Sequence, residues 1–230
     1  MLRRFLVGSL VAIMMLAGYF AFEANSLKQA VKDKENELTR LEIEKDGLEL
    51  SSNTELSESS APSYSQWIQS SELAEQLYKE SEGRFKREWG LFLGEITQQK
   101  GMDPYIVYEL LKVETGGSFD PTVVGPETRF GVAYGMGQFM TNTAPWIADR
   151  ANLEYKQEYL FEPLYSIQLS VEYLDYLYEE YEDWDYALTA YNRGMTGLKK
   201  YVEKNGHAKS EYAVTIQQGV LQHDAIAFNQ

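Results

Sequence analysis

Residues 104–121 read PYIVYELLKVETGGSFDP and join a helix start, an apolar stripe and an acid. On helical spacing, Val107, Leu110 and Leu111 lie on one face, and Glu114 takes the next place on that face. Asp103, just before the segment, is a helix N-cap residue, and Pro104 stands in the first turn. Gly116 and Gly117 follow the acid closely. The spacing predicts a core helix that ends on a partly buried carboxylate.

Three features of this position would raise the pKa of Glu114. Burial disfavours the charged carboxylate, and the C-terminal end of a helix carries partial negative charge. The basic residue of this segment, Lys112, points away, so no lysine or arginine shares the helix face of Glu114. An acid with a pKa raised towards about 6 can donate a proton near neutral pH. On spacing alone, the competing interpretation is an ordinary exposed acid at a helix end.

Composition narrows the classes of function. The 230 residues include 21 basic and 35 acidic side chains, a net charge of −14. This balance argues against nucleic acid as a partner, because lysine and arginine supply most of that affinity. There is no cysteine, and the two histidines, His207 and His223, form no metal-binding motif. We therefore expect no metal and no cofactor, and chemistry carried by carboxylates, amides and aromatic rings.

The N-terminus predicts a membrane anchor over residues 1–24. An uncharged run from Phe5 to Phe22 would span roughly 27 Å as a helix, close to the thickness of a bilayer core. Arg3 and Arg4 would stay in the cytoplasm, which places the rest of the chain outside. A cleaved signal peptide is the alternative, but no small-x-small cleavage site follows the run.

Two segments follow the anchor. Residues 25–50 are charged and helix-prone, and they predict a helical stalk. A coiled coil that mediates self-association or binds a partner is an option, although Lys34 and Lys45 fill core heptad positions. Residues 51–63 are rich in serine and predict a flexible linker.

Residues 64–230 predict an all-α domain. The uneven apolar pattern of residues 67–99 fits one or two helices, and Ile167, Val171, Leu174 and Tyr178 form another helical stripe. A further stripe begins at Trp184 and is expected to stop at Gly194, and a last helix is expected near residues 210–221. Strand-like alternation is scarce. The region between residues 115 and 140 is glycine-rich and irregular.

Four motifs in this domain resemble those of the soluble lytic transglycosylases, relatives of goose-type lysozyme. ETGGSFDP at 114–121 is similar to E-S-x-F-x-P, and GMGQFMTNTA at 135–144 is similar to G-L-M-Q-L-M-P-x-T-A. LYSIQLSVEYL at 164–174 is similar to N-I-x-x-G-x-x-Y-L, and ALTAYNRG at 187–194 matches A-L-x-A-Y-N-x-G. The resemblance implies a lysozyme-like helical fold.

The sequence departs from the family pattern at four points. Thr115 replaces a serine, and the segment from Glu114 to Phe119 is two residues longer than usual. Gly137 stands where methionine is usual, and Thr141 stands where proline is usual. We expect Gly137 to widen the cleft or to let the backbone approach a sugar.

The resemblance implies roles for individual residues. Glu114 would be the catalytic acid that protonates the glycosidic oxygen between MurNAc and GlcNAc in peptidoglycan. Gln138 would bind the sugar, Tyr191 would face the acid, and Asn192 would fix the turn and the cleft wall. The substrate-binding residues implied by the matched motifs are Gln138, Tyr191, Asn192, Thr115 and Met136.

Two reactions could use Glu114 as the acid. Hydrolysis with inversion needs a second carboxylate roughly 6.5–9.5 Å away; Glu127 is the candidate, since Asp120 before a proline fits a turn. Without a second carboxylate, the 6-hydroxyl of MurNAc attacks C1 of the same sugar and leaves a 1,6-anhydro sugar. This is the lytic transglycosylase route, which we favour.

A non-catalytic, membrane-tethered wall-binding scaffold is the third interpretation. The absence of a lipidation cysteine favours a Gram-positive bacterium and its cell membrane.

Overall fold

A computed structural model describes residues 63–227, together with Lys28 and Lys34. The predicted anchor and, apart from those two lysines, the predicted stalk lie outside the described residues, as does the linker before Ser63. Among the described residues, the helices are too short or too polar to span a membrane.

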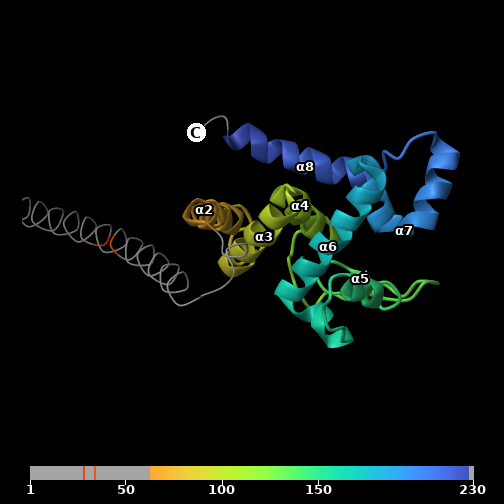
Figure 1. The fold of residues 1–230 in the computed structure, drawn as a ribbon, viewed down its shortest axis with the longest axis horizontal. Coiled ribbons are helices and arrows are strands. Elements are labelled where there is room, and N and C mark those ends of the chain that lie inside the picture. The colour runs from red at the N-terminus through yellow and green to blue at the C-terminus, as the bar shows by residue number, and fades with distance from the viewer. Residues whose placement is uncertain (1–27, 29–33, 35–62, 228–230) are drawn as a thin grey trace, which may run out of the picture. The chain divides into compact units, whose positions relative to one another are not determined.

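Within residues 63–227 the domain is built from α-helices, one 3₁₀ helix and one two-stranded sheet (Figure 1). The elements are α2 (Tyr64–Glu80), α3 (Arg87–Lys100), α4 (Pro104–Glu114), β1 (Ala133–Tyr134), β2 (Phe139–Met140), α5 (Ala144–Arg150), η1 (Gln157–Phe161), α6 (Pro163–Tyr181), α7 (Trp184–Asn205) and α8 (Glu211–Ala227). The predominantly helical prediction for this domain is thus confirmed.

Helix α4 forms as its sequence predicts. Asp103 caps the N-terminus by accepting a 2.9 Å hydrogen bond from the Tyr105 amide, and Pro104 occupies the first turn. The apolar stripe of Val107, Leu110 and Leu111 is fully buried. Helix α8 packs along α4, as Figure 1 shows, while α3 and α6 also contact it. The helix that carries Glu114 is therefore held by packing against three other helices.

Helix α6 contributes to two hydrophobic cores. On one side, Ile167, Val171 and Leu174 pack with α4 and with the inner residues of α3 and α8. On the other side, Leu169 and Leu177 pack with α5 and α7. Tyr178, which the sequence pattern places in the buried stripe, is 39% exposed. The stripe is therefore correct except at this last position.

Two local features differ from the sequence-based expectation. Gly194 breaks the helical dihedral angles, with φ 69° and ψ 159°, but helical structure resumes and runs to Asn205. The glycine-rich region contains a short antiparallel pair, in which Ala133 faces Met140 and Tyr134 faces Phe139. Both strands have two residues, which is too short for an alternating pattern to be read from the sequence.

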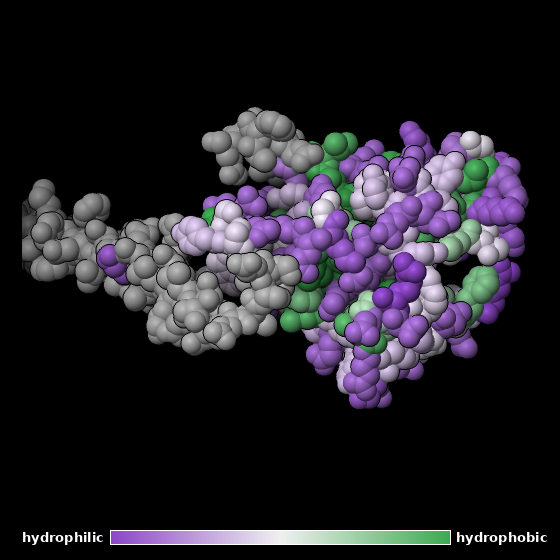
Figure 2. Space-filling model, in the orientation of Figure 1, coloured by the Kyte–Doolittle hydropathy of each residue, from purple (hydrophilic) through white to green (hydrophobic). Residues whose placement is uncertain are grey.

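The hairpin turn between β1 and β2 requires glycine at position 135. Gly135 has φ +71°, and a side chain there would collide with the carbonyl oxygen of Leu160. The visible face of the domain is largely hydrophilic, with small hydrophobic patches (Figure 2). This agrees with the excess of acidic side chains in the sequence.

Candidate active site

Glu114 is the final residue of α4, and a tight turn follows it. Gly116 and Gly117 both adopt positive φ, 58° and 79°, which glycine reaches without strain. The Gly117 amide donates to the Lys112 carbonyl at 2.7 Å, and the Arg84 guanidinium donates to the Gly117 carbonyl at 2.7 Å. Hydrogen bonds from α4 and from the segment between α2 and α3 thus hold the turn in place. The Glu114 side chain beside it is half-buried.

Tyr212 is the hydrogen-bond partner of Glu114. Its hydroxyl, from the first turn of α8, donates to Oε1 of Glu114 at 2.6 Å. No local sequence pattern predicts this partner, because the two positions are 98 residues apart in the chain. The packing of α8 along α4 could have suggested which face of α8 points inward, but only once that packing was known.

The pKa of Glu114 is strongly perturbed. Burial raises it from 4.5 to about 7, and the hydrogen bond from Tyr212 opposes this shift without cancelling it. The direction agrees with the prediction, and burial is the cause that dominates. A carboxyl group with this pKa is neutral in about half of the molecules at neutral pH, so it has a proton to donate.

Tyr191 lies near Glu114 and is fixed by hydrogen bonds. Its hydroxyl donates to the Gly137 carbonyl at 2.9 Å and lies 3.3 Å from the Ser170 hydroxyl. Burial and the nearby charge of Glu114 raise the pKa of Tyr191 well above its ordinary value. Tyr191 therefore stays protonated at any pH at which the domain would work.

Gly137 is required for packing. A side chain at this position would collide with the Phe139 ring and come within 2.7 Å of the Ser170 hydroxyl. Its amide donates to Ser166 at 3.0 Å, while its carbonyl accepts from Tyr191. The expectation that Gly137 widens the cleft is corrected, because the space beside its Cα is filled by neighbouring side chains.

Gln138 stabilises the loop on which it lies. It adopts a left-handed conformation, φ 48°, and its side-chain amide donates to the carbonyls of Gly135 at 2.8 Å and Val123 at 3.3 Å. A side chain at Gly125 would come within 2.7 Å of the Gln138 side-chain oxygen. A sugar-binding role for Gln138 stays a prediction.

Two residues of the predicted substrate-binding set lie beneath the site. Met136 is fully buried in the core around α4, a packing role in place of the predicted substrate contact. The buried Thr115 hydroxyl donates to the Leu111 carbonyl at 2.7 Å and accepts from the Phe119 amide at 3.0 Å. Thr115 therefore caps α4 and holds the longer turn after Glu114.

The remaining predicted residues lie on the surface. Asn192 is exposed on α7, two residues before the break at Gly194, and its role stays a prediction. Glu127 is exposed, in the segment before the tight turn that Thr128 and Gly131 close. Asp120 accepts hydrogen bonds from the amide and hydroxyl of Thr122 at 2.8 and 2.7 Å, so it serves a turn as predicted.

A second group of charged side chains surrounds the buried residues Glu109 and His223. Glu80, Glu109 and His223 come close enough to offer ligand atoms to a metal ion. However, His223 lies between the two carboxylates, 2.8 Å from Glu109 and 3.1 Å from Glu80, and the Lys112 ammonium is 2.8 Å from Glu109. Two cations thus neutralise two anions, and this cluster is better described as an ion network that joins α2, α4 and α8.

These features define a mainly helical domain in which one half-buried glutamate with a raised pKa lies beside two tyrosines held by hydrogen bonds. Residues 92–214 match the family model described as the transglycosylase SLT domain, and this protein belongs to that family. Membership supports, in general terms, a glycan-cleaving activity on peptidoglycan. Comparison with curated protein sequences gave no match.

Among solved structures, the chain is similar to an inactive mutant of the lytic transglycosylase Slt from Pseudomonas aeruginosa. The two share 17% identity with a TM-score of 0.43, over 54% of this chain and 20% of the other. The chain thus spans about one fifth of the length of that protein.

Proposed function

We propose that this protein cleaves the β-1,4 bond between MurNAc and GlcNAc in peptidoglycan as a lytic transglycosylase, with Glu114 as the general acid and then the general base. The observation that carries the proposal is the raised pKa of Glu114, about 7, in a half-buried position at a helix end. Family membership supports the substrate class. The specific reaction and the role of Glu114 are the parts that need testing.

The proposed reaction uses one carboxyl group twice. Neutral Glu114 gives its proton to the glycosidic oxygen as the bond to MurNAc C1 breaks, and the N-acetyl oxygen of MurNAc stabilises the positive charge at C1. The Glu114 carboxylate then takes the proton of the MurNAc 6-hydroxyl while that oxygen bonds to C1. The products are a strand with a 1,6-anhydro end and a strand with a free GlcNAc 4-hydroxyl, and Glu114 is again protonated.

The contacts of Glu114 assign different tasks to its two oxygens. Oε1 accepts the Tyr212 hydrogen bond, so Oε2 is the oxygen that would carry the proton to and from the substrate. The same hydrogen bond stabilises the anion that exists between the two proton transfers, because bonds to a charged acceptor are the stronger ones. Tyr212 would therefore lower the free energy of the state in which Glu114 is ionised, without supplying a proton itself.

The alternative is hydrolysis with Glu127 as the second carboxylate. Glu127 is exposed, and Asp120 is bound within its own turn, so neither is held in a position typical of a buried general base. These observations favour the anhydro route. A non-catalytic scaffold is disfavoured because a pure binder gains nothing from burying an acid whose ionised form is destabilised.

The proposal includes the location of the domain. Residues 1–24 would anchor the protein in a bacterial cell membrane, and residues 25–63 would give the outward-facing domain reach into the wall. The uncharged run and its flanking arginines support this orientation. Mass measurement of the mature N-terminus tests it, since a cleaved chain would lack the first segment and a retained chain would keep it.

The decisive experiment is digestion of purified peptidoglycan by the full-length chain, followed by mass analysis of the released fragments. Fragments with 1,6-anhydro ends support the proposal, whereas reducing ends would establish hydrolysis and intact strands would favour the scaffold. Glu127→Gln serves as the matched control for Glu114→Gln. It should leave the anhydro product unchanged and would abolish activity only in the hydrolytic case.

A further inference from the structure

A cavity lies between α5, α6 and the end of α3. Its volume is about 160 Å³ and its walls include Trp146, Arg150, Tyr176, Lys100, Glu172 and Asp175. A water molecule occupies about 10–15 Å³ on this measure, so the cavity has room for roughly ten waters, comparable with one sugar ring. The mechanism proposed above uses none of these residues.

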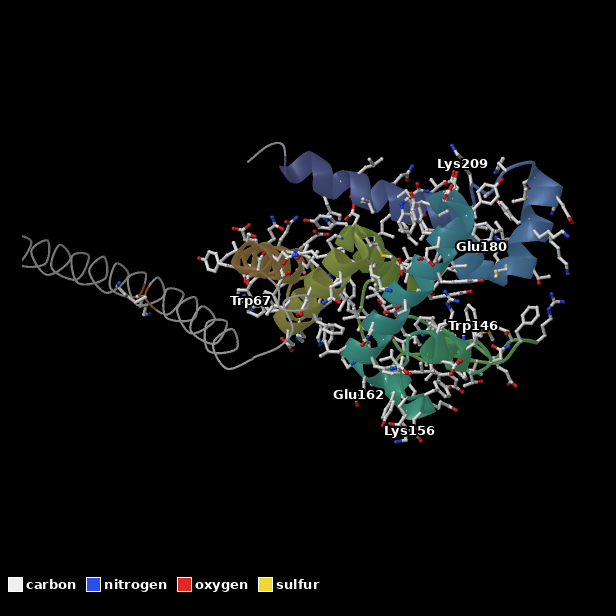
Figure 3. The ribbon with its side chains drawn as sticks, viewed as in Figure 1. Trp67, Trp146, Lys156, Glu162, Glu180 and Lys209 are labelled. Carbon is white, nitrogen blue, oxygen red and sulfur yellow. The ribbon has the colours of Figure 1, made fainter. Side chains whose placement is uncertain are left out.

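An exposed aromatic corner borders the cavity, whose own lining is mainly polar. The Trp146 side chain is 43% exposed, and its ring meets the Tyr176 ring edge-on, with centroids 4.9 Å apart and planes at 78°. Figure 3 labels Trp146 on α5. The Arg150 guanidinium lies 4.5 Å from the Tyr176 ring centre and restrains it. An exposed tryptophan fixed at the edge of a cavity offers a flat apolar surface for a ligand.

The polar wall of the cavity is nearly balanced in charge. The Lys100 ammonium donates to Glu172 at 3.0 Å and to Asp175 at 2.8 Å, which fixes all three side chains. Glu179 and Arg150 add one further charge of each sign. A strongly anionic or cationic ligand would meet like charge here, whereas a neutral ligand rich in hydroxyl groups would find both donors and acceptors.

Helix α6 separates this cavity from the Glu114 site and also connects the two. Ser170 of α6 contacts Tyr191 on one side of the helix, while Tyr176 faces the cavity on another. Between them lies the buried ring of Tyr173, whose centre is 5.2 Å from that of Tyr191 and 6.3 Å from that of Trp146. The cavity is thus a separate site within a short distance of the candidate active site.

We propose that this cavity binds one pyranose ring of a glycan strand, stacked on Trp146, and holds the strand without taking part in its cleavage. The proposal rests on peptidoglycan being the substrate, as proposed above. An uncharged, hydroxyl-rich ring with one apolar face matches the aromatic corner and the balanced polar wall.

Tryptophan fluorescence tests binding without cleavage. The full-length Glu114→Gln protein is titrated with the tetramer of N-acetylglucosamine, and we expect a saturable change in emission because Trp146 is the exposed tryptophan among the described residues. The change should disappear in the Glu114→Gln/Trp146→Phe double variant. No saturable change, or an equal change in the double variant, would overturn the proposal. This result does not depend on whether Glu114 is catalytic, so the two proposals fail separately.

Retention on insoluble peptidoglycan tests the role of the cavity. We expect Trp146→Ala to bind the wall about fivefold more weakly, from the usual contribution of aromatic stacking. The matched control is Tyr64→Ala, which removes an exposed ring from α2 and should bind as the unmodified protein does.

A third measurement separates holding from catalysis. The kcat of Trp146→Ala on a short soluble glycan should be unchanged, and a kcat loss equal to the binding loss would show that the cavity belongs to the reaction site. Arg150→Gln, which keeps both aromatic rings, should weaken wall binding in the same direction. Unchanged circular dichroism and melting temperature exclude misfolding of either variant, and wall binding unaffected in both would overturn the proposal.

Discussion

The hydroxyl of Tyr212 in α8 donates a 2.6 Å hydrogen bond to Oε1 of Glu114 at the end of α4. This contact opposes the effect of burial on the pKa of Glu114 and still leaves that pKa at about 7. The proton affinity of the candidate acid is therefore set by two elements that are distant in sequence.

Tyr212→Phe should shift the pH profile of cleavage to higher pH. The tyrosine hydrogen bond lowers the pKa of Glu114, so its loss raises that pKa and keeps the acid protonated to higher pH. At the same time kcat should fall about tenfold, because a charge-assisted hydrogen bond no longer stabilises the anion. A kcat profile measured from pH 5 to 9 checks both effects. A profile that keeps its position would show that Tyr212 does not act on Glu114.

Glu114→Gln should reduce cleavage by about 10² to 10⁴-fold, the usual contribution of general acid–base catalysis. The rate of release of wall fragments measures this loss, with Glu127→Gln as the control that makes the same side-chain replacement at an exposed position. Circular dichroism should be unchanged, because glutamine has nearly the same shape and can accept the Tyr212 hydrogen bond. Residual activity close to that of the unmodified protein would remove Glu114 from the mechanism.

The same Glu114→Gln variant should be more stable than the unmodified protein at pH 8 but not at pH 4. The folded-state pKa of Glu114 is raised from 4.5 to about 7, so its stabilising contribution is present below pH 4.5 and lost as the pH rises through 7. Glutamine stays neutral and avoids this loss. Urea unfolding should show a difference on the order of 2 kcal/mol at pH 8. Equal stabilities at both pH values would contradict the raised pKa.

His223→Gln should destabilise the domain at pH 6 and have less effect above pH 9. Burial lowers the pKa of His223, but hydrogen bonds and charge from Glu109 and Glu80 outweigh it and raise the pKa from 6.5 to about 9. The protonated ring therefore stabilises the fold fully below pH 6.5, and this contribution is lost as the pH rises through 9. Its surroundings also include Lys112, which pairs with Glu109, and the stacked ring of Tyr105.

Denaturant unfolding of the His223 variant at three pH values measures this effect. The expected loss at pH 6 is about 3 kcal/mol, typical of breaking a buried ion pair by removing one partner. The matched control is His207→Gln, the other histidine of the chain, which is exposed. A constant difference between the His223 variant and the unmodified protein across the pH range would show that His223 is neutral in the fold.

Gly137→Ala should cost about 1–3 kcal/mol of stability, typical of overpacking in a core. The added methyl group would meet the Phe139 ring and the Ser170 hydroxyl, and relieving the clash would move the carbonyl that Tyr191 holds. Cleavage should therefore fall together with stability. Gly101→Ala is the control, because a methyl group there meets no atom within 4 Å and costs only the strain of its positive φ. Thermal melting compares the two.

Local signals predicted much of this domain from its sequence. The cap at Asp103, the stripe of α4 and the direction of the Glu114 pKa shift follow from spacing and burial within a single helix. The apolar stripe likewise predicted helix α6, apart from the burial of Tyr178. The Tyr178 ring stacks on Trp184 at the helix surface, with centroids 4.4 Å apart. Such features depend on neighbours close in the chain.

The features that sequence reasoning missed depend on tertiary contacts. Tyr212 could be assigned to Glu114 only after α8 was seen to pack along α4. Met136 and Gly137 look like cleft residues within their motif, but Met136 is buried in the core around α4. The ring of Phe139 and the hydroxyl of Ser170 fill the space beside Gly137. A motif indicates which residues gather at a site, and packing determines which of them face the substrate.

The position of Tyr212 has a consequence for biosynthesis. Ribosomes make a chain from its N-terminus, so Glu114 emerges well before the helix that supplies its hydroxyl partner. Until α8 docks, a nascent chain holds an acid that lacks this donor. The hydrogen bond from Tyr212 to Glu114 would thus form late in synthesis, after most of the described domain has been translated.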